Sequence, residues 1–188
     1  PKIAPFKVVI IPIGEVTEEL AELESNLKES GITYKVDNTN KRPGYKFAEA
    51  EVKGFPIRIE LGERDLKNNQ VTLVRRDTLE KIAVSFAEII PKVQELLEDI
   101  QINLFETAKK RRDSMIYEVN TYEELLDIAK NKKGFVKINW CGDRACEDKI
   151  KEDTAMKSRC IIESEEVTGP CIVCGKKATT RLYVGKQY

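Results

Sequence analysis

FKVVIIPI, at residues 6–13, is a short run rich in β-branched side chains that ends next to Gly14. Such a run predicts a strand buried inside an α/β sheet. The next segment, Thr17–Ser30, places leucines at helical spacing and stops at Gly31. It therefore predicts a helix whose apolar face packs on that strand. The fold is expected to begin as a strand followed by a helix.

The same reading extends along the first half of the chain. Alternating or apolar runs predict further strands, a short helix and a long helix interrupted near Pro91. The expected strands are 32–36, 55–61 (FPIRIEL) and 70–75 (QVTLVR), and the expected helices are 45–53 and 79–97 with a continuation beyond residue 97. This order indicates an α/β domain over residues 1–105, with a mixed β-sheet flanked by helices.

After residue 105 the sequence predicts a connector and a second, smaller domain. A basic run, Lys109–Arg112, is expected on a helical connector over residues 106–120. Thr121–Glu124 resembles a capping box that opens a helix ending near Gly134. Phe135–Trp140 reads as a strand that runs directly into Cys141, and residues 181–188 as a last strand. We expect a small α+β domain over residues 106–188.

Composition limits the possible functions. The chain has 188 residues, 32 basic and 32 acidic, and no histidine. Without histidine, Ser-His-Asp sites, Cys-His sites and histidine-ligated metals are excluded. With no net charge, any nucleic-acid binding must depend on local patches. Neither a membrane-spanning run nor a signal peptide is visible, so a cytoplasmic location is expected.

Four of the five cysteines form two closely spaced pairs. Cys141 and Cys146 follow a predicted strand, and Cys171 and Cys174 form a C-x-x-C beside Gly175. Two such turns can hold one structural Zn²⁺ through four thiolates. Two disulfides or a redox-active C-x-x-C are the alternatives, and a cytosolic chain argues against stable disulfides. Cys160, in a strand-like run, is expected to be a core residue.

Residues 42–81 interleave basic side chains with Tyr45, Phe47 and a few carboxylates. Aromatic faces can stack on bases, while arginine and glutamate can read base edges, so the segment could bind single-stranded RNA. A solvated sheet face with ordinary ion pairs explains the same residues, and Glu60 and Glu63 favour that alternative.

In their order along the chain, these motifs resemble the C-terminal half of prolyl-tRNA synthetase of the archaeal and eukaryotic-like type. The matching runs are RPGYKF at 42–47, EVKGFPIRIELG at 51–62, RD at 64–65, KINWCG at 137–142, CE at 146–147, KSRCI at 157–161, CIVCG at 171–175 and the terminal Tyr188. The resemblance covers nearly the whole chain. It implies an anticodon-binding domain followed by a zinc-binding domain.

The resemblance further implies an enzyme that joins proline to tRNA(Pro) with ATP and Mg²⁺ and acts as a homodimer. It places the catalytic core before Pro1, and the carboxylate of Tyr188 toward that core. The residues that it implies for reading the two anticodon guanines are Phe47, Glu51, Arg58, Arg64 and Lys81. The implied zinc ligands are Cys141, Cys146, Cys171 and Cys174, and Cys160 is not among them.

Two other functions remain open from the residues themselves. One is a stand-alone, zinc-stabilised RNA-binding or regulatory protein built from the same domains. The other is a protein-interaction module in which the basic run Lys109–Arg112 docks a partner.

Overall fold

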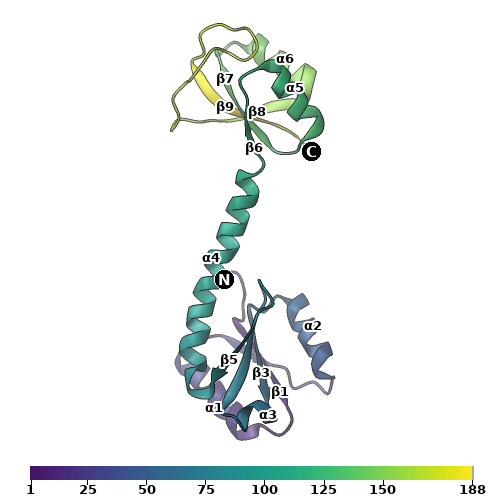
Figure 1. Cartoon of the computed structure of the whole chain (residues 1–188), viewed down its shortest axis with the longest axis vertical. Coiled ribbons are helices and arrows are strands. Elements are labelled where there is room, and N and C mark those ends of the chain that lie inside the picture. Colours follow the sequence, from purple (N-terminus) through teal and green to yellow (C-terminus); the bar gives the residue numbers. More distant parts are fainter. Residues whose placement is uncertain (188) are drawn as a thin grey trace. The chain divides into compact units, whose positions relative to one another are not determined.

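The computed structural model describes residues 1–187, so the prediction for Tyr188 lies outside the described residues. The chain divides into two compact units, unit 1 (Pro1–Thr107) and unit 2 (Ala108–Tyr188) (Figure 1). Each unit has its own sheet. None of the helices in the described residues combines the length and the apolar composition that a membrane span requires.

Unit 1 is built on a five-stranded sheet with strand order β2-β1-β3-β4-β5. Its elements, in chain order, are β1 (Val8–Ile13), α1 (Thr17–Glu29), β2 (Tyr34–Val36), α2 (Pro43–Lys53), β3 (Ile57–Gly62), α3 (Glu63–Leu66), β4 (Gln70–Arg75), β5 (Lys81–Ser85), the 3-10 turn η1 (Phe86–Glu88) and the first part of α4 (Ile89–Asp113). Strand β1 pairs in parallel with β2 and β3, and β4 pairs antiparallel with β3 and β5. The sheet is mixed, as predicted.

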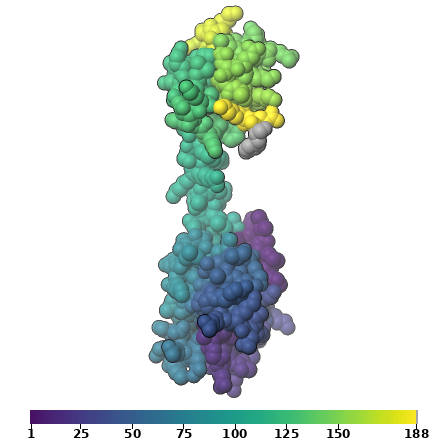
Figure 2. All heavy atoms as spheres, turned by 90° about the vertical axis from the view of Figure 1, so that its right-hand side faces the viewer, coloured from purple at the N-terminus to yellow at the C-terminus, as the bar shows by residue number. Residues whose placement is uncertain are grey.

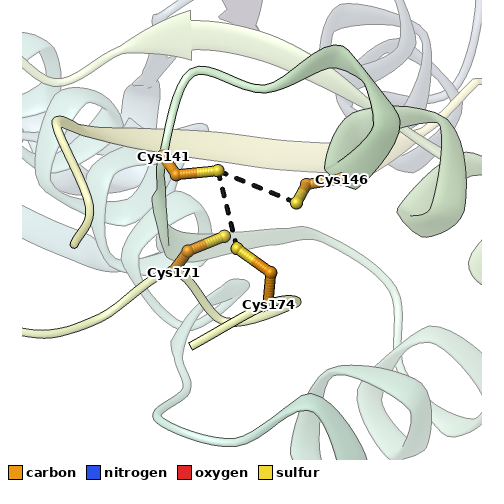
Figure 3. Close-up of side chains that lie close together, drawn as sticks. All are labelled: Cys141, Cys146, Cys171 and Cys174. Atoms are coloured by element: carbon orange, nitrogen blue, oxygen red, sulfur yellow. Dashed lines mark hydrogen bonds between the residues drawn. The ribbon is translucent and has the colours of Figure 1, made fainter. Parts of the chain in front are cut away.

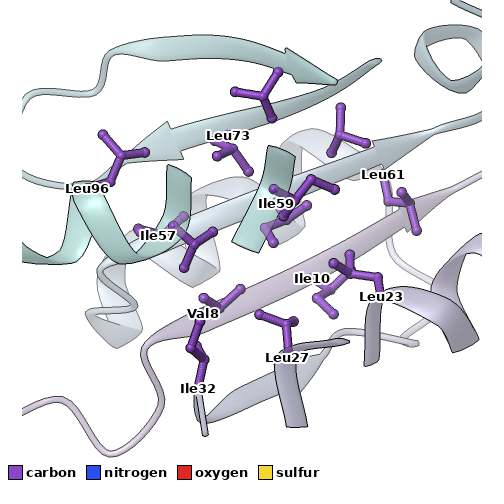
Figure 4. Packing of buried hydrophobic residues seen from close by; sticks show 14 of the residues in the cluster. Val8, Ile10, Leu23, Leu27, Ile32, Ile57, Ile59, Leu61, Leu73 and Leu96 are labelled. Carbon is purple, nitrogen blue, oxygen red and sulfur yellow. The ribbon is translucent and has the colours of Figure 1, made fainter. Parts of the chain in front are cut away.

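Helices cover the unit 1 sheet on both faces. Val8 and Ile10 point into the larger core with Leu27 of α1 and Leu96 of α4 (Figure 4). The alternate residues Val9 and Ile11 point to the opposite face, against Ala50 of α2. Because side chains alternate along a strand, a central strand covered on both faces must be apolar throughout. This requirement explains the uninterrupted run VVII in β1.

The prediction of a helix over residues 79–97 and beyond was wrong about its start and about the interruption near Pro91. Residues 81–85 form β5, whose Lys81 pairs with Val74 of β4. The helix begins only at Ile89 and continues without a break to Asp113. Pro91 lies in its first turn, where the backbone N–H that proline lacks would have no helical partner. Proline is tolerated there and does not interrupt the helix.

Unit 2 contains a four-stranded sheet with the order β6-β7-β9-β8. Its elements are the end of α4, β6 (Ile116–Glu118), α5 (Tyr122–Asn131), β7 (Phe135–Trp140), α6 (Arg144–Thr154), β8 (Met156–Ile161) and β9 (Thr180–Lys186). The helix therefore reaches only to Asp113 of the predicted connector, and residues 116–118 join the sheet. The pairing of β6 with β7 is parallel, and β9 is antiparallel to both β7 and β8.

The core of unit 2 lies between its sheet and helices α5 and α6. Val136 and Val184 from the sheet pack with Leu125 of α5 and Ile150 of α6. The opposite face of the sheet carries Phe135, which is 43% exposed. One face of this sheet is thus packed against helices, while the other carries an exposed aromatic ring.

Two local predictions for unit 2 are confirmed. Thr121 and Glu124 form the predicted capping box, in which each side chain accepts from the other residue's backbone N–H. Helix α5 ends before Gly134, whose φ of +132° and close approach to Met115 require glycine. A Cβ at position 134 would lie 2.0 Å from the Met115 carbonyl oxygen.

The expectation that Cys160 is a core residue was wrong. Cys160 lies on β8, one of the two edge strands of the sheet, at an irregularity in its pairing with β9. Its side chain is exposed. The side chains of a strand are buried only where another part of the protein covers them. Residues 157–161 of this edge strand are all exposed.

Candidate metal centre and nucleic-acid interface

The four paired cysteines come together from two turns of unit 2 (Figure 3). Cys141 directly follows β7, and Gly142, at φ +88°, reverses the chain. Asp143 then caps α6 by accepting from the Ala145 backbone N–H, which places Cys146 in the first helical turn. Strand, glycine turn and capped helix thus bring both sulfurs of the first pair to one side.

The second pair lies in a tight turn after Pro170. The backbone N–H of Gly175 donates to the Cys171 carbonyl at 2.9 Å, and Gly175 has a φ of +70°. The backbone N–H of Ile172 donates to the Asn139 carbonyl at 3.0 Å, and this bond fixes the turn beside β7. The two turns are therefore held next to one another by backbone hydrogen bonds.

The spacing of the sulfurs fits one tetrahedral ion. All four Sγ atoms lie within 4.8 Å of one another. The Cys141 Sγ lies 3.7 Å from both Cys146 Sγ and Cys174 Sγ. Four sulfurs at the Zn–S distance of about 2.3 Å from a single ion would lie about 3.8 Å apart. A closed set of four thiolates is typical of structural Zn²⁺, and iron can occupy the same geometry.

The surroundings of Cys171 already favour a thiolate. Burial by itself would raise the pKa of the Cys171 thiol. The backbone amides of Cys174, Val173 and Cys141 outweigh burial and lower this pKa to about 7. Amides that point at a sulfur stabilise its negative charge. This environment suits a metal ligand, which must be deprotonated.

In unit 1, strand register places polar side chains on the face covered by α2. Arg58 of β3 pairs with Val74 of β4, which pairs with Lys81 of β5. These three positions form one row across the sheet, so Arg58 and Lys81 share a face. Phe47 and Glu51, one helical turn apart on α2, lie above this row.

Arg58 lies at the centre of this group, and its side chain is only 7% exposed. Its Nη1 donates to Glu51 Oε1 at 2.8 Å, and its Nε donates to Glu60 Oε1 at 3.0 Å. Its guanidinium carbon lies 4.5 Å from the centre of the Phe47 ring. The Lys81 Nζ lies 3.5 Å from Glu60 Oε2 and 5.7 Å from the Phe47 ring centre. We call these five residues the Arg58 cluster.

The Arg58 cluster places each side chain in a distinct environment. Arg58 and Glu60 are buried, whereas Glu51 and Lys81 are 41% and 59% exposed. The guanidinium of Arg58 is already engaged by carboxylates and an aromatic ring. Solvent therefore reaches the Glu51 carboxylate and the Lys81 ammonium more readily than it reaches Arg58.

Of the five residues that the resemblance assigns to the anticodon, four lie in the Arg58 cluster. Arg64 lies elsewhere, exposed in the short helix α3 beyond the end of β3. Residues 58 and 62 lie near opposite ends of β3, about 13 Å apart along the strand. Arg64 is therefore outside the Arg58 cluster and would meet a different part of any bound ligand.

The resemblance assigns neither Glu60 nor Arg76 to the anticodon. In the sequence Glu60 favours a solvated sheet face, yet its carboxylate accepts from Arg58 and lies beside Lys81. Its place two residues after Arg58 on a strand was the available signal, because such residues share a face. Arg76 donates from Nε to the Glu51 backbone carbonyl at 2.9 Å, a contact that no local pattern encodes.

Comparison with known proteins gives two family matches in chain order. Residues 7–96 match the family model described as "Anticodon binding domain". Residues 122–188 match the model described as "Prolyl-tRNA synthetase, C-terminal". The first match falls within unit 1 and the second within unit 2.

Similar whole proteins cover both units. The chain is 45% identical to the proline–tRNA ligase of Lachnospira eligens and 48% identical to one from Clostridium botulinum, in each case over its full length and 40% of the relative. A crystal structure of prolyl-tRNA synthetase from Cryptosporidium parvum, complexed with L-proline and AMP, superposes with a TM-score of 0.91 at 37% identity, covering 42% of that protein. The chain thus spans about two fifths of these relatives, and it belongs to the prolyl-tRNA synthetase family, of which it carries the anticodon-binding and C-terminal domains.

Proposed function

We propose that unit 1 reads the anticodon of tRNA(Pro) as part of a proline–tRNA ligase. In this proposal the ligase joins proline to tRNA(Pro) using ATP and Mg²⁺, acts as a homodimer and works in the cytoplasm. The catalytic core would lie in the part of the relatives that this chain does not cover. This chain would then supply recognition, while the reaction takes place elsewhere in the longer protein.

The observation that carries the proposal is the state of the Glu51 carboxylate. One of its oxygens, Oε1, accepts from the buried Arg58, while the side chain remains 41% exposed. A carboxylate held in this way is an acceptor with a fixed orientation. The Watson–Crick edge of guanine offers N1–H and N2–H donors that match such a carboxylate. Lys81, which is also exposed, can donate to guanine O6 on the same edge.

Arg58 is better suited to positioning than to direct contact. To reach a base, its buried guanidinium would have to give up Glu51 or Glu60 and leave a carboxylate without its partner, which is costly. We therefore propose that Arg58 orients Glu51. Phe47 lies against the same guanidinium and supplies an aromatic surface for stacking. Arg64, beyond the end of β3, would contact a neighbouring nucleotide.

For unit 2 we propose that Cys141, Cys146, Cys171 and Cys174 hold one Zn²⁺. The ion would join the turn after β7 to the turn at residues 171–174 and so close the unit. With four protein ligands it would have no open position for a substrate, so its contribution would be structural.

The test of anticodon reading uses the 188-residue chain and an anticodon stem–loop whose two guanines are replaced, one at a time, by inosine. Inosine lacks the exocyclic amine, so at the position that meets Glu51 it should weaken binding by about 1–3 kcal/mol. In Glu51→Gln this difference between guanosine and inosine should largely disappear. Fluorescence anisotropy measures both affinities.

Glu49→Gln is the matched control, because Glu49 lies on the same helix and, within the described residues, forms its ion pairs with Lys41 and Lys53. It should keep the full discrimination against inosine. Equal binding of every stem–loop by the unmodified chain would overturn the proposal and favour non-specific RNA affinity.

A further inference from the structure

The turn that joins β4 to β5, residues 76–80, carries an arginine that is fixed in place. The Arg76 backbone N–H donates to the Pro56 carbonyl at 3.0 Å, and its Nε donates to the Glu51 carbonyl at 2.9 Å. The side chain is exposed. Within residues 1–187 it forms no ion pair with a carboxylate, so its positive charge is oriented but not neutralised.

The adjacent arginine shows what a purely structural role looks like. Arg75 forms a two-pronged pair with Asp77, at 3.0 and 2.8 Å, and Asp77 also accepts from Asn103. This carboxylate is only 3% exposed. Arg75 is thus fully used inside the fold. Arg76 donates one side-chain hydrogen bond to the last turn of α2, and its remaining guanidinium N–H groups are available to a ligand.

Leu79, in the same turn, combines two unfavourable features. Its φ is +61°, a left-handed conformation that is strained for a leucine, and its side chain is 58% exposed. Glycine or asparagine would adopt this backbone more easily. Leu79, Arg76 and Glu51 are among the residues that line one very small pocket, together with Arg58. An exposed apolar side chain in a strained turn therefore borders the Arg58 cluster.

We propose that Arg76 and Leu79 form a second RNA contact beside Glu51. In this contact Arg76 binds a backbone phosphate, and Leu79 packs against the base or ribose of the same nucleotide. The inference rests on the proposed anticodon reading by unit 1. Helix α2 and its surroundings, drawn in blue, face the viewer in Figure 2.

Charge balance explains why such a contact is needed. The Arg58 cluster contains two cations, Arg58 and Lys81, and two carboxylates, Glu51 and Glu60. It is therefore locally neutral and offers a phosphate no net attraction. The carboxylate of Glu51, which suits a guanine edge, even repels the phosphates around that base. A cation anchored to the Glu51 carbonyl offsets this repulsion where it arises.

Arg76→Gln separates this function from a structural one. Glutamine keeps a side-chain donor for the Glu51 carbonyl but removes the charge. We expect roughly tenfold weaker binding of the anticodon stem–loop. Between about 50 and 200 mM salt, the slope of log K against log salt should fall by about 0.7, the value for one phosphate contact to a single strand. Discrimination of guanosine from inosine should remain.

Arg111→Gln is the control, because Arg111 is another exposed arginine, in the last turn of α4. It should leave both the affinity and the salt slope unchanged. An Arg76→Gln chain with the salt slope of the unmodified chain would overturn the phosphate contact.

Leu79→Asn tests the apolar contact, because it should lower the affinity for RNA without lowering the stability of the fold. Asparagine tolerates the left-handed backbone, so the thermal unfolding midpoint should stay the same or rise. Affinity for the stem–loop should nevertheless fall by about threefold or more. Unchanged affinity would remove Leu79 from the contact.

The two proposals fail in different ways. If the unmodified chain does not distinguish guanosine from inosine, anticodon reading fails, and this inference fails with it. If the unmodified chain does distinguish them while Arg76→Gln and Leu79→Asn bind as it does, only the second contact is rejected.

Discussion

Units 1 and 2 each gather polar side chains from distant segments, but with very different amounts of apolar packing around them. Unit 1 has a core cluster of sixteen buried residues on one face of its sheet and a second cluster under α2 on the other. Unit 2 has a core cluster of ten buried residues, on one face of its sheet. Apolar burial is the main favourable term in folding, and small cores often need a metal or a cross-link.

This difference suggests different tasks for the two polar groups. Unit 1 can fold on its apolar core, which leaves the Arg58 cluster available for binding. Unit 2 has a smaller apolar core, so we propose that a metal held by its four sulfurs contributes to its folding. If this contrast is correct, substitutions and metal removal should affect the two units separately.

Removal of the metal should have the largest effect and should act on unit 2 alone. Four-thiolate zinc sites contribute on the order of 10 kcal/mol of apparent binding energy at neutral pH, which becomes folding energy where no site exists in the unfolded chain. Cys171→Ser or a strong chelator should therefore unfold unit 2 and leave unit 1 folded. Hydrogen exchange measured by mass spectrometry resolves the two units.

Cys160→Ser is the control for this prediction, because Cys160 is exposed and outside the sulfur cluster. It should not change exchange in either unit. Elemental analysis of the purified chain should find about one zinc per chain, from the four-ligand set. A metal-free chain that remains folded through residues 135–187 would contradict the contrast between the units.

Truncation of the unit 1 core should have the next largest effect. Leu73 is fully buried in β4. Leu73→Ala should destabilise unit 1 by about 2–5 kcal/mol, through lost transfer free energy and the cavity left behind. Chemical denaturation should give the same loss with and without metal. Val52→Ala, at a position that is 86% exposed, should cost almost nothing. A metal-dependent loss at Leu73 would show that the two units do not fold separately.

The buried carboxylate Asp77 should make unit 1 sensitive to acid. Burial by itself would raise the pKa of Asp77, but hydrogen bonds from Arg75 and Asn103 hold it below its ordinary value. A lowered pKa in the folded state stabilises the fold above the unfolded pKa of about 3.9, and the stabilisation is lost as pH falls through the folded pKa.

Asp77→Asn should therefore cost unit 1 about 2 kcal/mol at pH 7. The difference from the unmodified chain should shrink as pH falls below about 4. Urea unfolding at a series of pH values measures this difference. Asp65→Asn, at an exposed position, should show no comparable loss. A difference that stays constant with pH would mean that the charge of Asp77 is not involved.

The smallest expected effect concerns the capping box of α5 in unit 2. Thr121→Ala removes the acceptor for the Glu124 backbone N–H and should cost about 1 kcal/mol. Thr121→Ser keeps the hydroxyl and should restore most of this loss. Thermal unfolding of the metal-loaded chain measures both. If metal binding dominates unit 2, the loss should be visible only while the metal is bound.

Local sequence patterns predicted several elements correctly but failed where strand pairing determines the secondary structure. The apolar run of β1 and the capping box of α5 carry their own signals and were predicted correctly. The segment KIAVS at residues 81–85 is short, and the sequence pattern assigned it to a helix. It becomes β5 because it pairs with β4, from Val74–Lys81 to Gln70–Ser85. No signal inside five residues specifies that partner.

The two candidate sites also combine features that can be read from the sequence with features that depend on the fold. The candidate metal ligands can be identified without a structure, because the spacing of Cys141, Cys146, Cys171 and Cys174 and the absence of histidine are read directly from the chain. Three other features become visible only in the folded chain: Arg58 is buried between Glu51 and Glu60, Arg76 reaches the Glu51 carbonyl, and Cys160 is exposed at a sheet edge.

The physical reason is the range of the interactions. Turn conformation, helix capping and the choice of ligand atom are set within a few residues of the chain. The neighbours of a charged side chain are set by strand order and register, which join segments that are far apart in sequence. Burial and pairing therefore appear only when the whole sheet has formed.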